Sequence, residues 1–296
     1  MSREKVIIYN NNSSRKFGWT PEWFGATAFD NNLIDKIKDF QKENNLLQDG
    51  MCGSATFRRI FTQRESNIEE FSEEIQFDEN NKHIVFNGSF FPIKWNKVVL
   101  WGEENGLKAK KGNYREVIGE PREIKLFVNH WDVCLSSKSC QKVLDQRGLS
   151  VTFLIDNDGT IYQTCDMQHI TWHTGNQNKF ATGVEISNAY YTKYQDWYVK
   201  NGFGERPIKT GTVRGKELEK HLGFYPIQID AVKALWEAVA NACDIPMRCP
   251  LLNGKEHDGY YDPAAKGEWK GFIHHFNVSN NKIDCGGFSL QKHLNK

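Results

Sequence analysis

Four short β-patterned runs in the middle of the chain constrain its fold more than any other feature. The four runs span residues 124–128, 151–155, 160–163 and 183–187. The turn residues Asp156-Asn157-Asp158-Gly159 separate the second run from the third by the length of a hairpin loop. We therefore predict a central β-sheet in which these two runs form a hairpin.

Residues 230–243 carry the clearest helix pattern of the chain. Apolar residues recur there on one helical face, and the segment stops before Pro246. The Asn87-Gly88 pair between apolar residues predicts a second hairpin, because both residues tolerate positive φ. Strands interrupted by helices and long loops are typical of an α/β domain with a mixed central sheet flanked by helices.

The N-terminal part of the chain predicts a small helical bundle. Residues 21–64 have apolar side chains at helical spacing, interrupted by a turn at Gly50. Acidic and polar residues dominate 65–80, which is typical of a connector or a solvated helix. We place the boundary there, between a helical domain over residues 1–66 and a second domain over residues 67–296 that begins with the connector.

Charge and cysteine usage narrow the classes of function. The 38 basic and 37 acidic residues give a net charge of +1, so no broad field attracts nucleic acid or an anionic membrane. The seven cysteines form no Cys-x-x-Cys pair and are odd in number, which favours reduced thiols in a protein made in the cytoplasm. We find neither the apolar core of a signal peptide nor a stretch that approaches the length of a membrane span.

Three residues far apart in the sequence suit a zinc site. A β-patterned run ends at His130, and a stretch near the C-terminus contains His275 and Asp284. Catalytic zinc takes three such ligands and keeps an open position for water. Glu185 and Lys282 are candidates for the chemistry beside the metal. Each of these residues has an ordinary alternative as a packed histidine or a surface charge, and a buried pair of Glu185 with Lys282 is the most serious one.

The four motifs of the second domain occur together in one order. They are His130, Trp172-His173-Thr174-Gly175, Gly183-Val184-Glu185, and His275-Phe276-Asn277-Val278-Ser279 with Lys282-Ile283-Asp284. In this order and spacing they resemble the zinc-dependent N-acetylmuramoyl-L-alanine amidases. That family includes bacterial wall-recycling enzymes, phage endolysins and animal peptidoglycan-recognition proteins.

A second, shorter resemblance lies in the N-terminal domain. Phe40-Gln41, Asp49-Gly50, Gly53 and Thr56 resemble the signature of small peptidoglycan-binding modules. Such a module in front of an amidase domain is similar to a modular phage endolysin. The alternative is a helical bundle that only packs on its neighbour.

The amidase resemblance implies a role for each site residue. It makes His130, His275 and Asp284 the ligands of Zn²⁺. It makes Glu185 the residue that handles the proton of the attacking water, and Lys282 the residue that stabilises charge on the substrate oxygen. These roles agree with the general chemistry of zinc hydrolases.

Two ligand assignments stay open at this point. Some relatives use a cysteine as the third ligand, and Cys285 directly follows Asp284. The spacing from Lys282 favours Asp284. His274 precedes His275, and the motif His-x-Asn-Val-Ser favours His275.

By resemblance, Trp172 and His173 line the substrate cleft, where an aromatic face suits a sugar ring and an imidazole can donate a hydrogen bond. A tryptophan used only in the core is the alternative. Some relatives carry a tyrosine on the strand where this chain has Val151-Thr152-Phe153. Its absence implies the arrangement in which a glutamate, here Glu185, does the catalytic work.

We therefore expect a peptidoglycan hydrolase that cleaves the amide between N-acetylmuramic acid and L-alanine during phage-induced lysis of the host. Its cofactor would be Zn²⁺ and its partner bacterial peptidoglycan, with no nucleic acid and no membrane insertion, and it would act as a monomer. It would be made in the host cytoplasm and reach the wall after release by another agent. The rival functions are a recognition protein without turnover and a zinc peptidase that cuts within the stem peptide.

Overall fold

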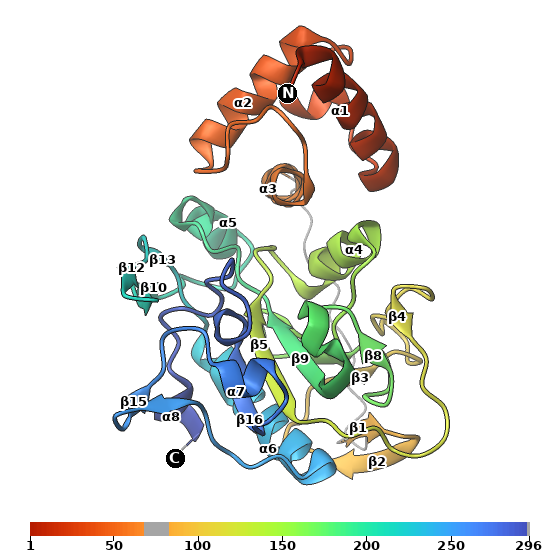
Figure 1. The fold of residues 1–296 in the computed structure, drawn as a ribbon, viewed down its shortest axis with the longest axis vertical. Coiled ribbons are helices and arrows are strands. Elements are labelled where there is room, and N and C mark those ends of the chain that lie inside the picture. Colours follow the sequence, from red (N-terminus) through yellow and green to blue (C-terminus); the bar gives the residue numbers. More distant parts are fainter. Residues whose placement is uncertain (68–82, 295–296) are drawn as a thin grey trace. The chain divides into compact units, whose positions relative to one another are not determined.

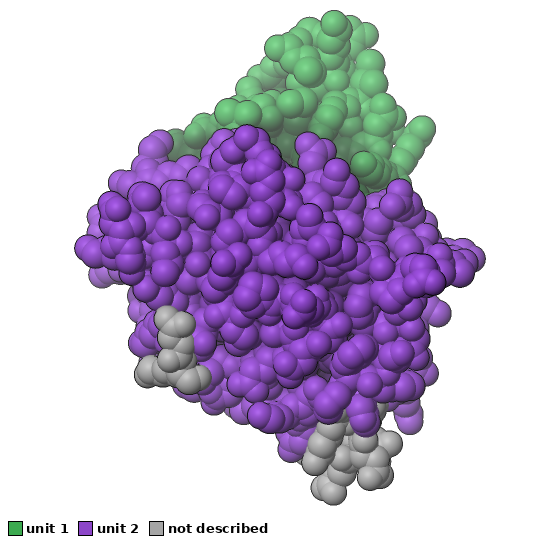
Figure 2. All heavy atoms as spheres, turned by 60° about the horizontal axis from the view of Figure 1, so that its bottom comes forward, with its two compact units in different colours: residues 1–71, 142–148 green, residues 72–141, 149–296 purple. Residues whose placement is uncertain are grey.

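The structure, a computed structural model, describes residues 1–67 and 83–294 and divides the chain into two compact units. The units comprise residues 1–71 with 142–148, and residues 72–141 with 149–296 (Figure 2). Most of the predicted acidic connector, residues 65–80, lies outside the described residues. Within the described residues, no helix has both the length and the apolar character that a membrane crossing requires.

The first unit is built from helices. They are α1 (Arg3–Phe17), the 3₁₀ helix η1 (Pro21–Phe24), α2 (Asn31–Glu43) and α3 (Ser54–Glu65). Helix α2 begins where the Asp30 carboxylate accepts the backbone N–H of Leu33 at 3.0 Å, which satisfies one of the free N–H groups of the first turn. The predicted helical bundle is confirmed from residue 21 onward.

Helix α1 lies in the predicted helical domain, but the sequence analysis recognised helical spacing only from residue 21. Its middle is a run of asparagines and serines, which are poor helix formers. Tertiary hydrogen bonds offset this weakness. The buried Asn10 amide donates to the Gly50 carbonyl and accepts the N–H of Cys52, both at 2.9 Å.

The second unit contains a six-stranded mixed sheet (Figure 1). Its strand order is β16 (Gly271–His274), β5 (Leu126–Trp131), β9 (Ala181–Ile186), β6 (Phe153–Ile155), β7 (Ile161–Gln163) and β3 (Val98–Leu100). All neighbours are parallel except the β6–β7 hairpin. The predicted mixed sheet and its four predicted strands are confirmed, whereas β3 and β16 were not predicted.

The two faces of this sheet have different partners, and β5 shows how side chains alternate between them. Phe127 belongs to the core formed with helix α6 (Pro226–Cys243). Leu126 and Val128 belong to the core on the other face, with the short helix α7 (Asp262–Ala265). Because alternate residues of a strand share a face, His130 lies on the face of α7.

Helix α6 covers the opposite face and fixes the strand that carries His130. Pro226 starts the helix, where its missing N–H costs no hydrogen bond. The Trp236 indole donates to Asn129 Oδ1 at 2.9 Å, and the Asn129 amide donates to the Ile273 carbonyl of β16 at 3.0 Å. One asparagine therefore ties α6, β5 and β16 together next to His130.

Small elements complete the second unit. Hairpin β1 (His83–Phe86) with β2 (Ser89–Pro92) confirms the turn predicted at Asn87-Gly88. The remaining ribbons are β4 (Tyr114–Arg115) with β8 (Ile170–Thr171), β10 (Ile208–Lys209) with β13 (His221–Leu222), β11 (Thr212–Val213) with β12 (Lys216–Glu217), and β14 (Leu251–Leu252) with β15 (Lys255–Glu256). The other helices of this unit are η2 (Gly175–Phe180), η3 (Thr192–Tyr194), α5 (Gln195–Lys200), η4 (His275–Asn277) and α8 (Leu290–Leu294). Helix α4 (Ser137–Arg147) begins in this unit, and its residues from 142 onward belong to the first unit.

Candidate functional site

The carboxyl ends of three parallel strands bring distant motifs to one edge of the sheet. His130 is the penultimate residue of β5 and pairs in register with Glu185 of β9. On the other side of β5, strand β16 runs directly into η4, which begins at His275. Register partners on neighbouring strands share a face, so Glu185 and His130 project to the same side of the sheet.

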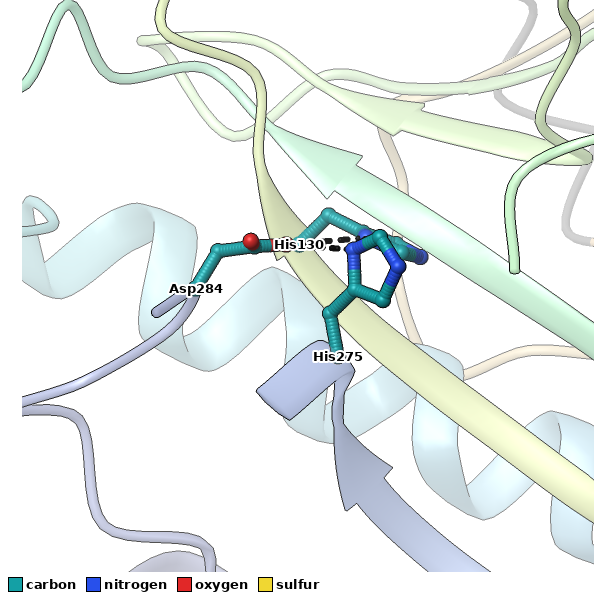
Figure 3. A group of neighbouring side chains, drawn as sticks. All are labelled: His130, His275 and Asp284. Atoms are coloured by element: carbon teal, nitrogen blue, oxygen red, sulfur yellow. Dashed lines mark hydrogen bonds and ion pairs between the residues drawn. The ribbon is translucent and has the colours of Figure 1, made fainter. Parts of the chain in front are cut away.

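His130, His275 and Asp284 form a tight cluster at this edge (Figure 3). The Nδ1 atoms of His130 and His275 lie 2.9 Å apart, and each lies 3.0 Å from Asp284 Oδ2. All three residues are buried, with exposures of 2%, 7% and 8%. Three metal-ligating atoms from separate elements therefore converge on one point.

Burial and mutual charge set the protonation of this cluster. Burial lowers the pKa of His130 to about 4, and the neighbouring His275 adds to the effect, while the carboxylate of Asp284 opposes it. Burial alone would raise the pKa of Asp284, but the two imidazoles hold it well below its usual range. At neutral pH the cluster offers a neutral His130 imidazole and an ionised Asp284 carboxylate, the forms that bind a metal.

The alternative ligands His274 and Cys285 have surroundings that do not suit a metal ligand. His274 turns away from the cluster, since its Nε2 lies 3.1 Å from Glu256 Oε1. Cys285 is buried next to Asp284, and burial together with nearby carboxylates raises the pKa of its thiol well above the usual value. A protonated thiol is a poor metal ligand. The side chains that come together are those of His275 and Asp284.

Lys282 lies in the loop that carries Asp284, and its side chain is half-buried. Its carbonyl accepts a hydrogen bond from Arg214 Nη1 at 2.9 Å, which anchors the loop. Its positive charge is close enough to contribute to the lowered pKa of His130. Glu185, also half-buried, and Lys282 therefore both flank the cluster.

Trp172 and His173 approach the cluster from the end of β8. His173 Nδ1 lies 3.0 Å from His130 Nε2, so this imidazole touches a candidate ligand directly. Burial, with the positive charges of nearby groups, lowers the pKa of His173 well below its usual value, so the ring is neutral. Trp172 is half-buried and lines a cavity whose other walls come from β4 and η2.

The sequence analysis gave no role to two asparagines that position these side chains. Asn178 Oδ1 accepts the N–H groups of His173 and Thr174 at 3.1 and 2.8 Å. Asn277 Oδ1 accepts the N–H of His274 at 2.9 Å and so fixes the entry to η4. Asparagine side chains near turns often form hydrogen bonds with nearby backbone groups. This preference is the sequence signal that could have identified Asn178 and Asn277.

A second group of metal-ligating types lies deeper in the same unit. Asp132, Cys134 and Cys140 are all buried, with their ligand atoms within 4.8 Å of one another. Burial raises the pKa of Asp132 to about 7 and that of the Cys140 thiol well above its usual value. Asp132 Oδ1 also accepts the N–H groups of Cys134 and Asn188, both at 2.9 Å. Hydrogen bonds from two backbone N–H groups to Asp132 and a protonated Cys140 thiol suit a structural loop better than a metal site.

Comparison with known protein families identifies both parts of the chain. A family model described as N-acetylmuramoyl-L-alanine amidase matches residues 120–268, half of the chain. A model of a peptidoglycan binding domain matches residues 16–60. The amidase match includes His130 and Glu185 and ends before His275. No curated protein matches the chain.

Several solved structures are similar at low sequence identity. The endolysin amidase LysCS from Clostridium intestinale URNW is 15% identical, with a TM-score of 0.38 over 67% of this chain and 92% of that chain. AmpDh3 from Pseudomonas aeruginosa, solved with an anhydromuramic pentapeptide, is 17% identical, with a TM-score of 0.39 over 64% and 65%. Drosophila peptidoglycan recognition protein SA is 17% identical, with a TM-score of 0.30 over 60% and 79%.

The family assignment rests on the match over residues 120–268, and it confirms the resemblance that the sequence motifs indicated. The binding-domain match lies within the N-terminal helices. The chain therefore belongs to the N-acetylmuramoyl-L-alanine amidase family of peptidoglycan hydrolases and carries a peptidoglycan-binding module in front of its amidase domain.

Proposed function

We propose that the chain is a zinc-dependent amidase that hydrolyses the amide between the lactyl group of N-acetylmuramic acid and the L-alanine of the stem peptide. The convergence of His130 Nδ1, His275 Nδ1 and Asp284 Oδ2 carries this proposal, with mutual distances of 2.9 to 3.0 Å. Two imidazoles and a carboxylate suit Zn²⁺ and leave a fourth position for water.

The three side chains fit zinc in spacing and in charge. Bond lengths of ~2.0 to 2.2 Å put neighbouring donors of a tetrahedral zinc ~3.3 Å apart. The distances between these three atoms lie close to that value. The lowered pKa values of His130 and Asp284 keep both groups deprotonated at neutral pH, as metal ligands must be. When bound, zinc would polarise the substrate carbonyl and lower the pKa of a water molecule.

Glu185 is the residue that we assign to proton transfer. Its side chain lies on the same face as His130, one strand away, and neighbouring strands are ~4.8 Å apart. From there a carboxylate can take the proton of the attacking water and return it to the amine that leaves with L-alanine. Transfer of this kind contributes roughly 10²- to 10⁴-fold to a rate.

Lys282 is the residue that we assign to the substrate oxygen. The amide oxygen gains negative charge as water adds to its carbon, and an ammonium group beside it stabilises that charge. A single donor of this kind typically contributes about 2.7 to 4 kcal/mol to the transition state. The electrostatic effect of Lys282 on the pKa of His130 supports its nearness to the reacting atoms.

Trp172 and His173 are the residues that we assign to the substrate side of the site. The Trp172 ring lines a cavity and can cover the apolar face of a sugar or peptide. His173 contacts His130 through Nδ1, and its Nε2 has no hydrogen-bond partner among the described residues. That buried N–H is a donor that a substrate carbonyl could accept from.

End-group analysis of digested peptidoglycan tests the proposal. Purified walls are incubated with the protein, with and without a zinc chelator, and new amino termini and reducing sugar ends are counted. Chelator-sensitive alanine termini without new reducing ends support the amidase. Termini from another stem residue would point to a peptidase, and wall binding without new ends would point to a recognition protein.

The biological role that we propose is lysis of a bacterial host during phage infection. A wall-binding module raises the local concentration of a tethered hydrolase on an insoluble polymer, which suits rapid lysis. The protein would act on the wall after another factor opens the membrane. Added protein should therefore clear permeabilised cells and leave intact Gram-negative cells unaffected.

A further inference from the structure

The loop that carries Lys282 and Asp284 is buried at one end and exposed at the other. Asp284 and the two residues that follow it are buried, whereas the residues on both sides of Lys282 are exposed. The Asp284 carbonyl accepts the N–H of Phe276 at 3.3 Å, which holds the buried end next to the metal cluster. Exposed segments open locally at a low cost in free energy, because few buried contacts oppose the opening. The position of Lys282 therefore depends on contacts that the loop makes with other elements.

Arg214 makes one of these contacts from the turn between β11 and β12. Its Nη1 donates to the Lys282 carbonyl at 2.9 Å, across 68 residues of sequence. Asp258 accepts two backbone N–H groups of this turn. Its carbonyl accepts that of Arg214 at 2.8 Å, and its carboxylate accepts that of Gly215 at 3.3 Å. These bonds hold Arg214 at a φ of +52°, which residues other than glycine adopt uncommonly. The guanidinium therefore extends from a fixed backbone.

The segment around β11 and β12 also packs directly against the loop. A Cβ atom on Gly211 would lie 2.4 Å from the Gly287 nitrogen, and one on Gly286 would lie 2.4 Å from Leu218 Cδ1. Contacts this short require glycine, because they leave no room for a side chain between the two segments. Leu218 in turn packs against the core of the second unit. The ribbon of β11 and β12 is therefore a packed support for the loop, and Arg214 extends this support to Lys282.

Lys282 needs such a support because of the nature of its side chain. Its ammonium group sits on a flexible four-carbon stem, so a shift of the backbone carries the charge with it. A displacement of about 1 Å at a reacting group can cost roughly 10²-fold in rate. We propose that Arg214 is a positioning residue for Lys282, because its hydrogen bond fixes the backbone from which the ammonium reaches the substrate oxygen. Asp284 has its own support at the buried end, so Arg214 acts on turnover and not on zinc binding.

This inference rests on the proposed function, and a double-mutant cycle tests it. Arg214→Met and Lys282→Met are made singly and together, because methionine keeps an apolar stem and removes the donor. The matched control is Arg248→Met. Arg248 Nε also donates to a backbone carbonyl at 2.9 Å, that of Lys270. Lys270 lies just before β16, at the end of that strand away from the metal cluster.

Arg214→Met should lower kcat for soluble muramoyl peptide about 10- to 100-fold, with KM and zinc affinity within about twofold of the wild type. In the Lys282→Met background the same substitution should change kcat by less than about twofold, because its effect passes through Lys282. Arg248→Met should keep the wild-type kcat. An equal loss in both backgrounds, an unchanged kcat in Arg214→Met, or a loss of zinc would overturn the inference.

Amide hydrogen exchange separates this inference from the proposed function, because it needs no turnover. Loss of a charge-assisted hydrogen bond should raise the exchange rates of residues 279–286 about tenfold in Arg214→Met. Helix α6 should exchange at the wild-type rate, which shows that the variant is folded, and Arg248→Met should leave the loop unchanged. If the wild type cleaves no muramoyl peptide but this pattern appears, the proposed function fails and the support of Lys282 by Arg214 holds. Unchanged exchange of the loop would refute that support.

Discussion

His173 Nδ1 lies 3.0 Å from His130 Nε2, on the side of the His130 ring away from Asp284. His173 is neutral, because burial lowers its pKa, so its Nδ1 can accept a hydrogen bond. If His130 Nε2 donates that hydrogen bond, the Nδ1 lone pair of His130 is directed at the metal position. His173 then acts as a positioning residue for the metal ligand, in addition to its place on the substrate side.

Replacement of His173 should consequently weaken metal binding. Loss of such a supporting hydrogen bond typically costs 10- to 100-fold in metal affinity, and we expect His173→Ala to fall in that range. Competition with a chelator of known zinc affinity measures it. Trp172→Ala, the neighbouring change, should leave zinc affinity within about twofold of wild type. If His173→Ala binds zinc as tightly as the wild type, His173 has a role on the substrate side only.

Glu185→Gln should separate metal binding from turnover. The amide keeps the size of the side chain but cannot take a proton, so kcat should fall roughly 10²- to 10⁴-fold while zinc stays stoichiometric. His130→Ala should instead lose both zinc and activity. Metal analysis beside rate measurements on soluble muramoyl peptide distinguishes the two variants. An active Glu185→Gln enzyme would return Glu185 to a purely structural role.

The close packing around Gly183 explains why the Gly183-Val184-Glu185 motif begins with a glycine. A Cβ atom there would lie 2.5 Å from the Val128 carbonyl oxygen and 2.8 Å from His173 Cε1. Gly183→Ala should therefore force β5 and β9 apart or displace His173, at a cost of about 1 to 3 kcal/mol in the free energy of unfolding. Gly102→Ala, where a Cβ meets nothing within 4 Å, is the matched control. Urea denaturation of both variants tests this.

The four inner strands of the sheet were predictable from local patterns, whereas its two edge strands, β3 and β16, were not. The runs around residues 126, 153, 161 and 183 are apolar enough to identify themselves as strands. Strand β3 has three residues and β16 leads directly into a turn, so neither forms a distinct pattern. Helix α1 depends on Asn10 contacts with the loop around Gly50, which no local window contains.

The candidate site was predictable in composition but not in every detail. The order and spacing of the motifs indicated which residues would meet, because a zinc site requires two imidazoles and a carboxylate in one place. The choice between His274 and His275 depends on Glu256, which lies 18 residues upstream of His274 and forms a hydrogen bond with its Nε2. The cavity beside Trp172 depends on the pairing of β4 with β8, two strands of two residues each. Such short pairings leave no periodic signal.

Glu256 should make the stability of the apoprotein depend on acid pH. Burial alone would raise the pKa of its carboxyl group, but hydrogen bonds from His274, Ser289 and the Gln291 backbone lower it to about 2 from an ordinary 4.5. Its contribution, about 3 kcal/mol, is present above pH 4.5 and is lost as the pH falls toward 2. With a chelator present, the unfolding free energy of Glu256→Gln should fall less steeply from pH 4.5 toward pH 2 than that of the wild type. Glu104→Gln, an exposed control, should retain the wild-type slope.

Gly50 provides a way to disable the binding module without touching the amidase domain. Its φ is +74°, and a Cβ would lie 2.6 Å from Ile34 Cγ2 and 3.2 Å from the Ile34 carbonyl oxygen, so Gly50→Ala combines backbone strain with a clash against α2. Gly25 has the same φ and open space around it, so Gly25→Ala carries the strain alone.

We expect Gly50→Ala to lose most binding to purified peptidoglycan in a sedimentation assay, while Gly25→Ala keeps it. Both variants should cleave soluble muramoyl peptide at the wild-type rate, because the site residues lie in the other unit. On insoluble walls only Gly50→Ala should slow, since it lacks the local concentration that the module provides. A parallel loss on soluble substrate would mean that the helical unit supports the amidase fold itself.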